Sequence, residues 1–341
     1  MDYNKIVAAL DAAKGKRIVV IGDYCLDKYI YSDPAEDDIS VETGLYAHQV
    51  YLKKMSAGGA GSVSKNLATL GAKVICVGFV GDDGEGYELI RELNAMGADT
   101  SFMLRTPELA TATYMKTMRK QADGSFREET RIDFRNRGIP ENLRARIEEN
   151  FKAALKDADG VMVLDQFFER NSGVIGDGLR ETVNELSKAS TLPFLADSRS
   201  FISEFRNCYV KCNNLELMKI CLPDGNPESL EDIVKGGNAL MQLTGKPVFT
   251  TRGTEGIVIF DGKSISKVPA YVVTGEIDIV GAGDASSASL ILSLCAGLSC
   301  AEAAVVACAV SSITIQQIGT TGSTTVAEAA PRIKALCELC D

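Results

Sequence analysis

The sequence has 341 residues, of which 45% are hydrophobic, and a formal net charge of −10. Such a chain can bury a large core in one large α/β domain or two smaller ones, and its acidic balance disfavours nucleic acids and anionic membranes as partners. The longest apolar run, residues 303–315, is too short to span a bilayer, and residues 1–16 lack the apolar segment of a secretion signal, so we expect a cytoplasmic protein.

The cysteines and the single histidine exclude several kinds of site. Ten cysteines occur mostly as single residues in apolar stretches, as Cys295 and Cys308 do, which is typical of buried thiols in a reducing compartment. Cys337 and Cys340 form one C-x-x-C pair without a second pair of ligands, which disfavours a structural zinc site. His48 is the only histidine, so nucleophilic catalysis based on histidine is also disfavoured.

The first part of the chain combines a buried strand with exposed strands. Residues 17–21 form a continuous apolar run that predicts a strand buried on both faces of a parallel sheet. Polar and apolar residues alternate over 29–54, which predicts exposed antiparallel strands outside the main sheet. Segments 112–118 and 125–132 alternate in the same way and predict a hairpin. We expect these strands to form a lid.

A glycine segment, Gly58-Gly59-Ala60-Gly61, lies between these regions and predicts the start of a helix that runs to about Leu70. A strand at 73–79, a loop at 81–84 and a helix ending near Met96 follow. This order of elements indicates that the lid segments are insertions into an α/β domain.

From residue 141 onward helices and strands alternate, which predicts a parallel sheet covered on both faces. The predicted helices cover 141–156, 173–189 and 228–244, and the predicted strands cover 161–164, 193–196, 247–250 and 257–260. Asp165, Asp197 and Asn213 follow strands, where ligands of such sheets bind, so we expect them at one cleft. Each could instead be an ordinary cap or loop residue.

The motif with the clearest chemistry is Asp278-Ile279-Val280-Gly281-Ala282-Gly283-Asp284, which precedes an apolar helical run over 285–296. Its glycines allow several N–H groups to point outward at the positive end of the helix, which makes an anion site. Asp284 beside this site could take a proton from a hydroxyl that attacks a phosphate. The motif therefore predicts phosphoryl transfer. The alternative is a glycine turn with a capping aspartate.

The glycine segment at 58–61 together with the motif at 278–284 resembles the two signatures of the ribokinase-like (pfkB-type) sugar kinase family. Within this family the chain is most similar to the kinase module of bacterial heptose 7-phosphate kinases, at residues 22–29, 57–71, 131–134 and 319–321. The resemblance implies an α/β fold with a mostly parallel sheet, helices on both faces and a small β-sheet lid.

The resemblance implies one domain over residues 1–341, with the lid formed by about 30–56 and 110–133. The heptose enzymes with two activities carry an H-x-G-H signature in a nucleotidyltransferase domain. This chain has only His48, so we expect no such domain here. An apolar face of the lid that the core leaves uncovered predicts a homodimer through the lids.

The resemblance also implies residue roles at the transfer site and the sugar site. Asp284, which follows the Gly281-Ala282-Gly283 turn, is implied as the catalytic base, and the amides of Ala282, Gly283 and Asp284 are implied as the anion hole. Asp27, Gly58 and Gly59 match sugar-binding positions. Ser62 stands where the family commonly has asparagine, which changes the contacts to sugar hydroxyls.

A sugar substrate that carries a phosphate would also need cationic contacts. Lys116, Arg119 and Arg131 on the alternating segments are the candidates, although exposed cations are more often solvated surface charges.

For the nucleotide and the metal ions, the resemblance implies three groups of residues. Asn213 and Glu216 match an N-x-x-E element that organises phosphate and Mg²⁺ through water. The second group would bind ATP, through a nucleotide loop and one residue near the adenine: Thr251, Arg252, Gly253, Gly256 and Cys308. The third group lies in a region where many members of the family hold K⁺: Asp278, Gly319 and Ser323.

We therefore expect an ATP- and Mg²⁺-dependent kinase that phosphorylates a hydroxyl of a heptose 7-phosphate-like sugar phosphate. The alternatives are a kinase for another sugar or a nucleoside, and a relative that binds nucleotide or sugar without catalysis. Retention of Asp284 with both glycines disfavours the non-catalytic alternative. A dinucleotide-dependent oxidoreductase is excluded because Gly22-Asp23-Tyr24 does not continue as G-x-G-x-x-G.

Overall fold

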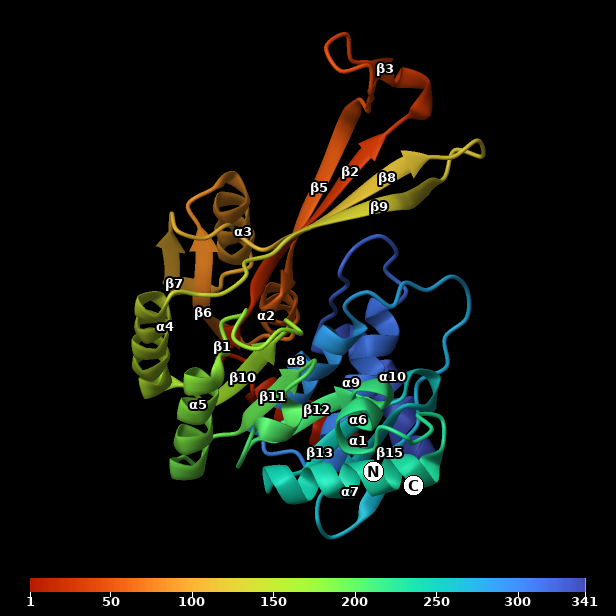
Figure 1. Cartoon of the computed structure of the whole chain (residues 1–341). Coiled ribbons are helices and arrows are strands. Elements are labelled where there is room, and N and C mark those ends of the chain that lie inside the picture. Colours follow the sequence, from red (N-terminus) through yellow and green to blue (C-terminus); the bar gives the residue numbers. More distant parts are fainter. Residues whose placement is uncertain (341) are drawn as a thin grey trace.

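The computed structural model describes residues 1–340, and within them nine strands form one twisted central sheet (Figure 1). The strand order is β15-β14-β13-β12-β11-β10-β1-β6-β7. The strands are β1 (Arg17–Gly22), β6 (Lys73–Gly81), β7 (Asp99–Thr106), β10 (Gly160–Asp165), β11 (Phe194–Ser198), β12 (Tyr209–Asn213), β13 (Val248–Thr251), β14 (Ile257–Phe260) and β15 (Ile265–Val268). All neighbours from β13 to β7 pair in parallel, and β14 and β15 pair antiparallel at one edge.

Strand β1 is buried on both faces, as its apolar run predicts. Ile18 and Val20 pack into one apolar cluster and Val19 and Ile21 into the other, because successive side chains of a strand point to opposite faces. Each is fully buried, and burying a side chain of this size contributes about 1.5–3 kcal/mol. The centre of the sheet is therefore fixed by the hydrophobic effect on both sides.

Helices cover both faces of the sheet, which confirms the predicted α/β architecture. The cluster that contains Val20 includes helices α1 (Tyr3–Ala12), α2 (Ala60–Thr69), α3 (Gly84–Ala95), α8 (Ala282–Cys295), α9 (Cys300–Thr314) and α10 (Val326–Leu339). The cluster that contains Val19 includes α4 (Glu141–Ala154), α5 (Asp177–Ala189), α6 (Asn214–Cys221) and α7 (Leu230–Thr244). The apolar run at 303–315 lies in α9, a core helix as predicted.

A second sheet extends away from the body of the molecule and forms the lid (Figure 1). Its strand order is β5-β2-β8-β9, with β2 (Tyr24–Ser32), β5 (Val50–Gly59), β8 (Thr113–Lys120) and β9 (Phe126–Phe134). At the tip, the short 3₁₀ turn η1 (Pro34–Glu36) precedes a two-stranded pair of β3 (Asp38–Ile39) and β4 (Tyr46–Ala47). Strands β5, β8 and β9 arise from the segments expected from their alternation, whereas β2 begins at Tyr24, before the alternating region that starts at residue 29.

The prediction that all lid strands are antiparallel was wrong for one pair. Strands β2 and β8 pair in parallel, from Leu26 with Thr113 to Ser32 with Arg119. Parallel strands need a crossover between them, and here the chain passes through β5, α2, β6, α3 and β7 before it returns as β8. Alternation of polar and apolar residues gives the face of each side chain but not the direction of the neighbouring strand.

Helix α5 begins later than the predicted residue 173. The backbone N–H of Val174 donates to Asp23 Oδ1 at 2.6 Å, which holds this stretch against β1 and out of the helix. Asn171 Oδ1 then accepts from the Asp177 N–H at 2.8 Å, where the helix starts. Tertiary contacts therefore decide this boundary.

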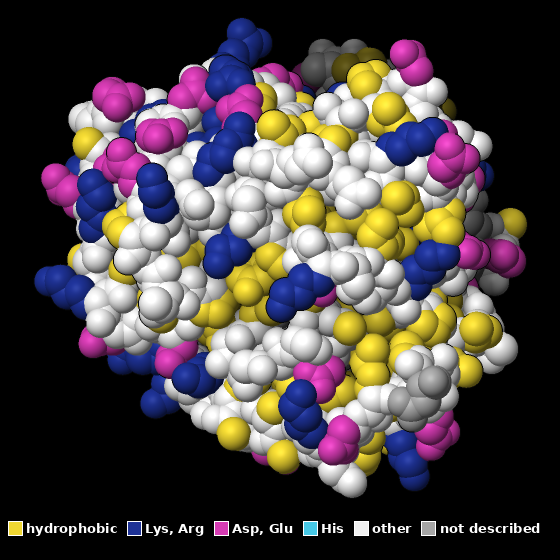
Figure 2. Space-filling view, turned by 90° about the horizontal axis from the view of Figure 1, so that it is seen from below, with side chains coloured by type: hydrophobic (Ala, Val, Ile, Leu, Met, Phe, Trp, Pro, Cys, Tyr) yellow, Lys and Arg dark blue, Asp and Glu magenta, His cyan; other side chains and the backbone are white. Residues whose placement is uncertain are grey.

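The face opposite the lid carries charges of both signs among apolar areas (Figure 2). Lys and Arg side chains lie between Asp and Glu side chains in this view, so no large field of one sign forms there. Within residues 1–340, no helix combines the length and the apolar character needed to cross a bilayer.

Candidate active site

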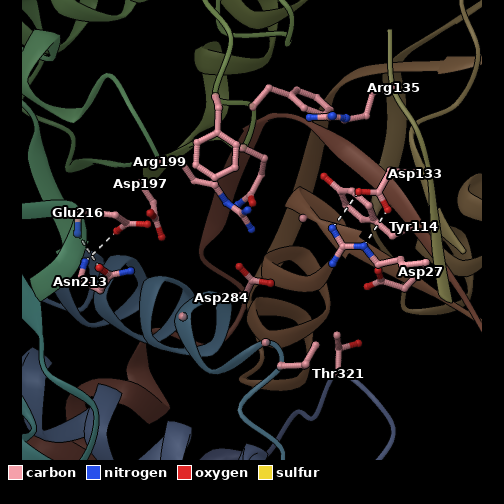
Figure 3. A pocket seen from close by; sticks show the side chains of 18 of the residues that line it. Asp27, Tyr114, Asp133, Arg135, Asp197, Arg199, Asn213, Glu216, Asp284 and Thr321 are labelled. Atoms are coloured by element: carbon pink, nitrogen blue, oxygen red, sulfur yellow. Dashed lines mark hydrogen bonds and ion pairs between the residues drawn. The ribbon is translucent and has the colours of Figure 1, made fainter. Parts of the chain in front are cut away.

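A cavity of about 510 Å³ lies between the lid and the carboxyl ends of the central strands. Figure 3 shows Asp284 in the middle of this cavity, with Asn213 and Glu216 on one side and Asp27 and Asp133 on the other. Ligands of open α/β sheets bind at this end of the strands. The cavity is lined by Asp27, Gly59, Tyr114, Lys116, Arg131, Asp133, Arg135, Gln166, Phe167, Phe168, Asp197, Arg199, Lys211, Asn213, Glu216, Val280, Gly281, Gly283, Asp284 and Thr321.

The first turn of α8, where the sequence predicts an anion site, lies in the cavity wall. Gly281 precedes the helix with φ of +82°, a left-handed conformation that glycine adopts without strain. The Ala282 N–H donates to Ile279 O at 3.2 Å, whereas the N–H groups of Gly283 and Asp284 have no partner among residues 1–340. The anion hole thus has two free backbone donors in place of the three expected.

Lys211 adds a positive charge to this anion site. A Cβ built at Gly283 would lie 3.1 Å from Lys211 Nζ, so the ammonium group stands directly over the helix start. Nζ donates to Asp197 Oδ2 at 2.9 Å, and Ser287 of α8 donates to the same oxygen at 2.8 Å. Burial disfavours the charged ammonium, but the negative charges of Asp197, Glu216 and Asp284 together more than offset it, and the pKa of Lys211 is raised. Lys211 therefore stays protonated.

Asp284 has the environment of a proton acceptor. Burial raises the pKa of its carboxyl to about 6, and the negative charges of Asp197 and Asp27 add to the rise. The Ser62 hydroxyl and the Lys211 ammonium oppose it. A carboxylate with a pKa nearer to neutrality accepts a proton more readily than an exposed aspartate, and it is still ionised at pH 7. Asp284 is thus suited to general base catalysis.

Most of the residues expected at the sugar site line the lid side of the cavity, but Gly58 and Ser62 do not reach its surface. Burial raises the pKa of Asp27, and the charges of Lys116 and then Arg131 lower it. A Cβ at Gly58 would lie 2.6 Å from Asp27 Oδ2, so a larger residue would displace this carboxylate. Ser62 is fully buried in α2, and its hydroxyl has no hydrogen-bond partner with ordinary geometry in the described chain.

The expected lid cations differ in their surroundings. Lys116 Nζ donates to the hydroxyl of Tyr29 at 2.9 Å and lines the cavity. Arg131 also lines it and donates to both oxygens of Asp133 at 2.8 Å. Arg119 pairs instead with Asp37 toward the lid tip and is not part of the cavity lining.

The profile of pfkB family carbohydrate kinases matches residues 16–327. The chain belongs to this family. It is an alcohol-group phosphotransferase, as the sequence resemblance implies. The kinase is 26% identical to the bifunctional protein HldE of Trichlorobacter lovleyi over 328 residues and 29% identical to that of Hyphomonas neptunium over 320 residues. These matches cover 94% and 93% of this chain but only 63% of each relative.

Solved structures confirm the ribokinase-like fold of the kinase. Arabidopsis thaliana ribokinase, in complex with ribose and ATP, matches with a TM-score of 0.70 and 19% identity, over 94% of this chain and 99% of that one. Escherichia coli phosphofructokinase-2, in complex with potassium, matches with a TM-score of 0.70 and 18% identity over the same shares.

On the side of the cavity opposite Asp27, Asn213 and Glu216 line the wall and cap α6 (Figure 3). The Asn213 N–H donates to Glu216 Oε2 at 2.9 Å, and the Glu216 N–H donates to Asn213 Oδ1 at 2.8 Å. Both residues are therefore held rigidly at the helix start. The other carboxylate oxygen of Glu216 has no hydrogen-bond partner among residues 1–340.

The expected nucleotide loop and adenine-side residue do not line this cavity as the structure has it. Arg252 donates to Glu228 O at 3.0 Å, and Gly253 and Gly256 turn the chain with positive φ angles. Thr251 ends β13, in the same strand-end row as Asn213. The remaining position, Cys308, lies in the core face of α9, where burial raises the pKa of its thiol to about 12.

The expected K⁺ region is only partly assembled. The Gly319 N–H donates to Asp278 Oδ2 at 3.1 Å, so these two residues meet through an amide and not through a carbonyl. The Ser323 carbonyl accepts from Gln317 at 2.9 Å. The Gly319 carbonyl has no hydrogen-bond partner among residues 1–340, so this region keeps an oxygen, beside the Asp278 carboxylate, that is available to a cation.

One of the residues expected at the strand ends lies outside the cavity, and several residues that line the cavity were not predicted from the sequence. Asp197 and Asn213 lie at the cleft as expected, but Asp165 turns away and accepts from Ser198 at 2.7 Å. Lys211 was missed, although a lysine within the apolar strand β12 is unusual enough to have marked it. The exposed Arg199 lines the cavity but stands in no periodic pattern that could have singled it out.

Proposed function

We propose that this kinase transfers the γ-phosphoryl group of ATP to the anomeric hydroxyl of a heptose 7-phosphate-like sugar phosphate. Its curated relatives are named as bifunctional HldE proteins, which favours a heptose substrate. The cavity also holds several cations, as a substrate that brings its own phosphate requires. The chain spans less than two thirds of those relatives, so only the kinase step is proposed.

The observation that carries the reaction is the position of Asp284 between the sugar side and the anion site. Asp284 would take the proton of the attacking hydroxyl, which Asp27 orients through another hydroxyl of the sugar. The free N–H groups of the α8 start and the Lys211 ammonium would stabilise the negative charge of the transferred group.

Mg²⁺ fits this site through few protein ligands. Glu216 offers one carboxylate oxygen, and no group of three or more His, Cys, Asp or Glu side chains suited to a metal occurs in residues 1–340. Such a sparse donor set matches Mg²⁺, which keeps several waters and binds ATP phosphates. When bound, the ion offsets the charge of the phosphates. Asp278, Gly319 and Ser323 would hold K⁺ if it is bound, and no step is assigned to it.

The test of this proposal is a comparison of substrates. ADP release should be fastest with heptose 7-phosphate, set against ribose, fructose, fructose phosphates and nucleosides. Faster turnover of an unphosphorylated sugar than of every sugar phosphate would remove the proposed substrate class. Ser62 gives a second candidate, a kinase for another sugar or a nucleoside, some support, because serine stands where the family commonly has the asparagine that contacts sugar hydroxyls.

The pH dependence follows from the pKa of Asp284. Burial raises this pKa to about 6, and only the ionised carboxylate can accept a proton. We expect kcat/KM to fall about tenfold for each pH unit below 6 and to level off above about pH 7. The measurement is kcat/KM between pH 5 and 8 at fixed ionic strength. A profile that is flat down to pH 5 would contradict the assignment of Asp284 as base.

We propose that the kinase forms a dimer through its lids. The tip exposes a group of large apolar side chains at 62–101% of their surface, namely Ile39, Val41, Leu45 and Tyr46. Replacing Val41 by Asp should shift the molecular mass measured by light scattering from dimer to monomer. Val272→Asp, at an exposed apolar position outside the lid, is the matched control. A wild-type protein that is monomeric at micromolar concentration would contradict the proposal.

The kinase is proposed to act in the cytoplasm, where ATP is available. All ten cysteines are free, as expected for a reducing compartment.

A further inference from the structure

A second cavity of about 360 Å³ adjoins the main one on its lid side. The two cavities share Asp133, Arg135 and Phe167 as wall residues. Figure 3 shows Arg135 and Asp133 on the side of the main cavity opposite Asn213 and Glu216. We call this second cavity the annex; it is lined by Asp133, Arg135, Asn136, Arg137, Phe167, Glu169 and Ser172. A substrate in the main cavity could extend into the annex without approaching the nucleotide side.

Two arginines line the annex, and the protein pairs one of them weakly and the other not at all within residues 1–340. Arg135 approaches Glu169 only at 3.5 Å, and their side chains are 44% and 61% exposed, so this pair contributes little. Arg137 lines the annex and has no hydrogen bond or ion pair among residues 1–340. Arg131 differs, because Asp133 pairs with it at 2.8 Å through both oxygens.

The backbone that carries the two arginines is fixed. Asn136 lies between them, and its side chain donates to Ala110 O at 2.8 Å and accepts from the Ala110 N–H at 3.2 Å. On the opposite wall, Ser172 donates to Glu169 O at 2.7 Å, and Phe167 is buried. Only the side chains of the two arginines are free to move. The loss of conformational entropy when they bind a ligand is therefore smaller than it would be on a mobile backbone.

We propose that the annex binds the phosphate group that the sugar substrate already carries, with Arg135 and Arg137 as its ligands. The inference rests on the proposed function and adds the position of this group. A sugar whose reactive hydroxyl lies at Asp284 would point its other end away from ATP and toward the annex. The planar guanidinium group donates two parallel hydrogen bonds to a phosphate, which the ammonium of Lys116 cannot do.

The test compares Arg135→Gln, Arg137→Gln and the double variant with Arg146→Gln, which removes the same charge from an exposed position on α4. With a sugar phosphate as substrate, each annex variant should raise KM on the order of tenfold to a hundredfold. With the same sugar lacking its phosphate, KM should change little. Equal losses on both substrates would show a structural role and overturn the proposal.

A second readout separates this inference from the proposed function. Inorganic phosphate should inhibit the wild-type enzyme competitively with the sugar substrate, and this inhibition should weaken at least tenfold in the double variant but not in Arg146→Gln. That result supports phosphate binding in the annex even if every sugar phosphate proves to be a poor substrate. Inhibition of equal strength in the wild type and the double variant would overturn the proposal that the annex binds phosphate. Thermal melting of each variant verifies that the fold is retained.

Discussion

Replacing Asp284 by Asn should lower kcat by roughly 10²–10⁴, the range expected for the loss of a positioned general base. Asn keeps the size of the side chain but cannot accept the proton of the attacking hydroxyl. The affinity for ATP should change much less, because the N–H groups of the α8 start and Lys211 remain in place. The measurement is steady-state turnover together with nucleotide binding by calorimetry.

The control for this variant is Glu276→Gln, which removes one negative charge from an exposed residue shortly before the motif. It should leave kcat close to the wild-type value. If Asp284→Asn turned over as fast as this control, Asp284 would not be the base. If the wild-type protein bound ATP but had no turnover on any sugar, the chain would be a non-catalytic member of its family.

Breaking the Lys211–Asp197 pair should have the largest effect on stability. Lys211→Met leaves the Asp197 carboxylate buried with only Ser287 as a partner, and removing one member of a buried ion pair costs about 3–5 kcal/mol. The same variant removes the cation over Gly283 and should also reduce turnover. Urea denaturation gives the free energy of unfolding, and assays of the folded protein give kcat.

The double variant Lys211→Met with Asp197→Asn separates the two effects. Removing both charges should restore much of the free energy of unfolding, because no uncompensated charge remains buried. It should not restore kcat, since the cation at the anion site is still missing. Losses in unfolding free energy that simply add in the double variant would contradict the strong coupling of this pair.

Much of the fold could be predicted because its patterns are local. The run at 17–21 is continuous since the side chains of β1 alternate between two apolar clusters, and the lid strands alternate since much of their surface faces solvent. The parallel pairing of β2 with β8 could not be predicted, because strand direction depends on the path between them. The start of α5 likewise depends on Asp23, which is distant in the sequence.

The candidate site also has a part that could be predicted from the sequence and a part that could not. The motif around Asp284 predicts its own geometry, because the turn at Gly281 and the helix start are adjacent in sequence. Lys211, Arg135 and Arg137 come from β12 and from the residues after β9, and only the fold brings them to the same region. Single cations carry no periodic signal, so the annex could be found only from its cavity.

The most direct test of the account is the identity of the product, measured by ³¹P nuclear magnetic resonance after reaction of the kinase with ATP and heptose 7-phosphate. The account predicts one new phosphate ester on the anomeric carbon, formed in equal amount with ADP, beside the unchanged phosphate of the substrate. No new sugar phosphate signal from this substrate, while an unphosphorylated sugar or a nucleoside gains a phosphate under the same conditions, would contradict it.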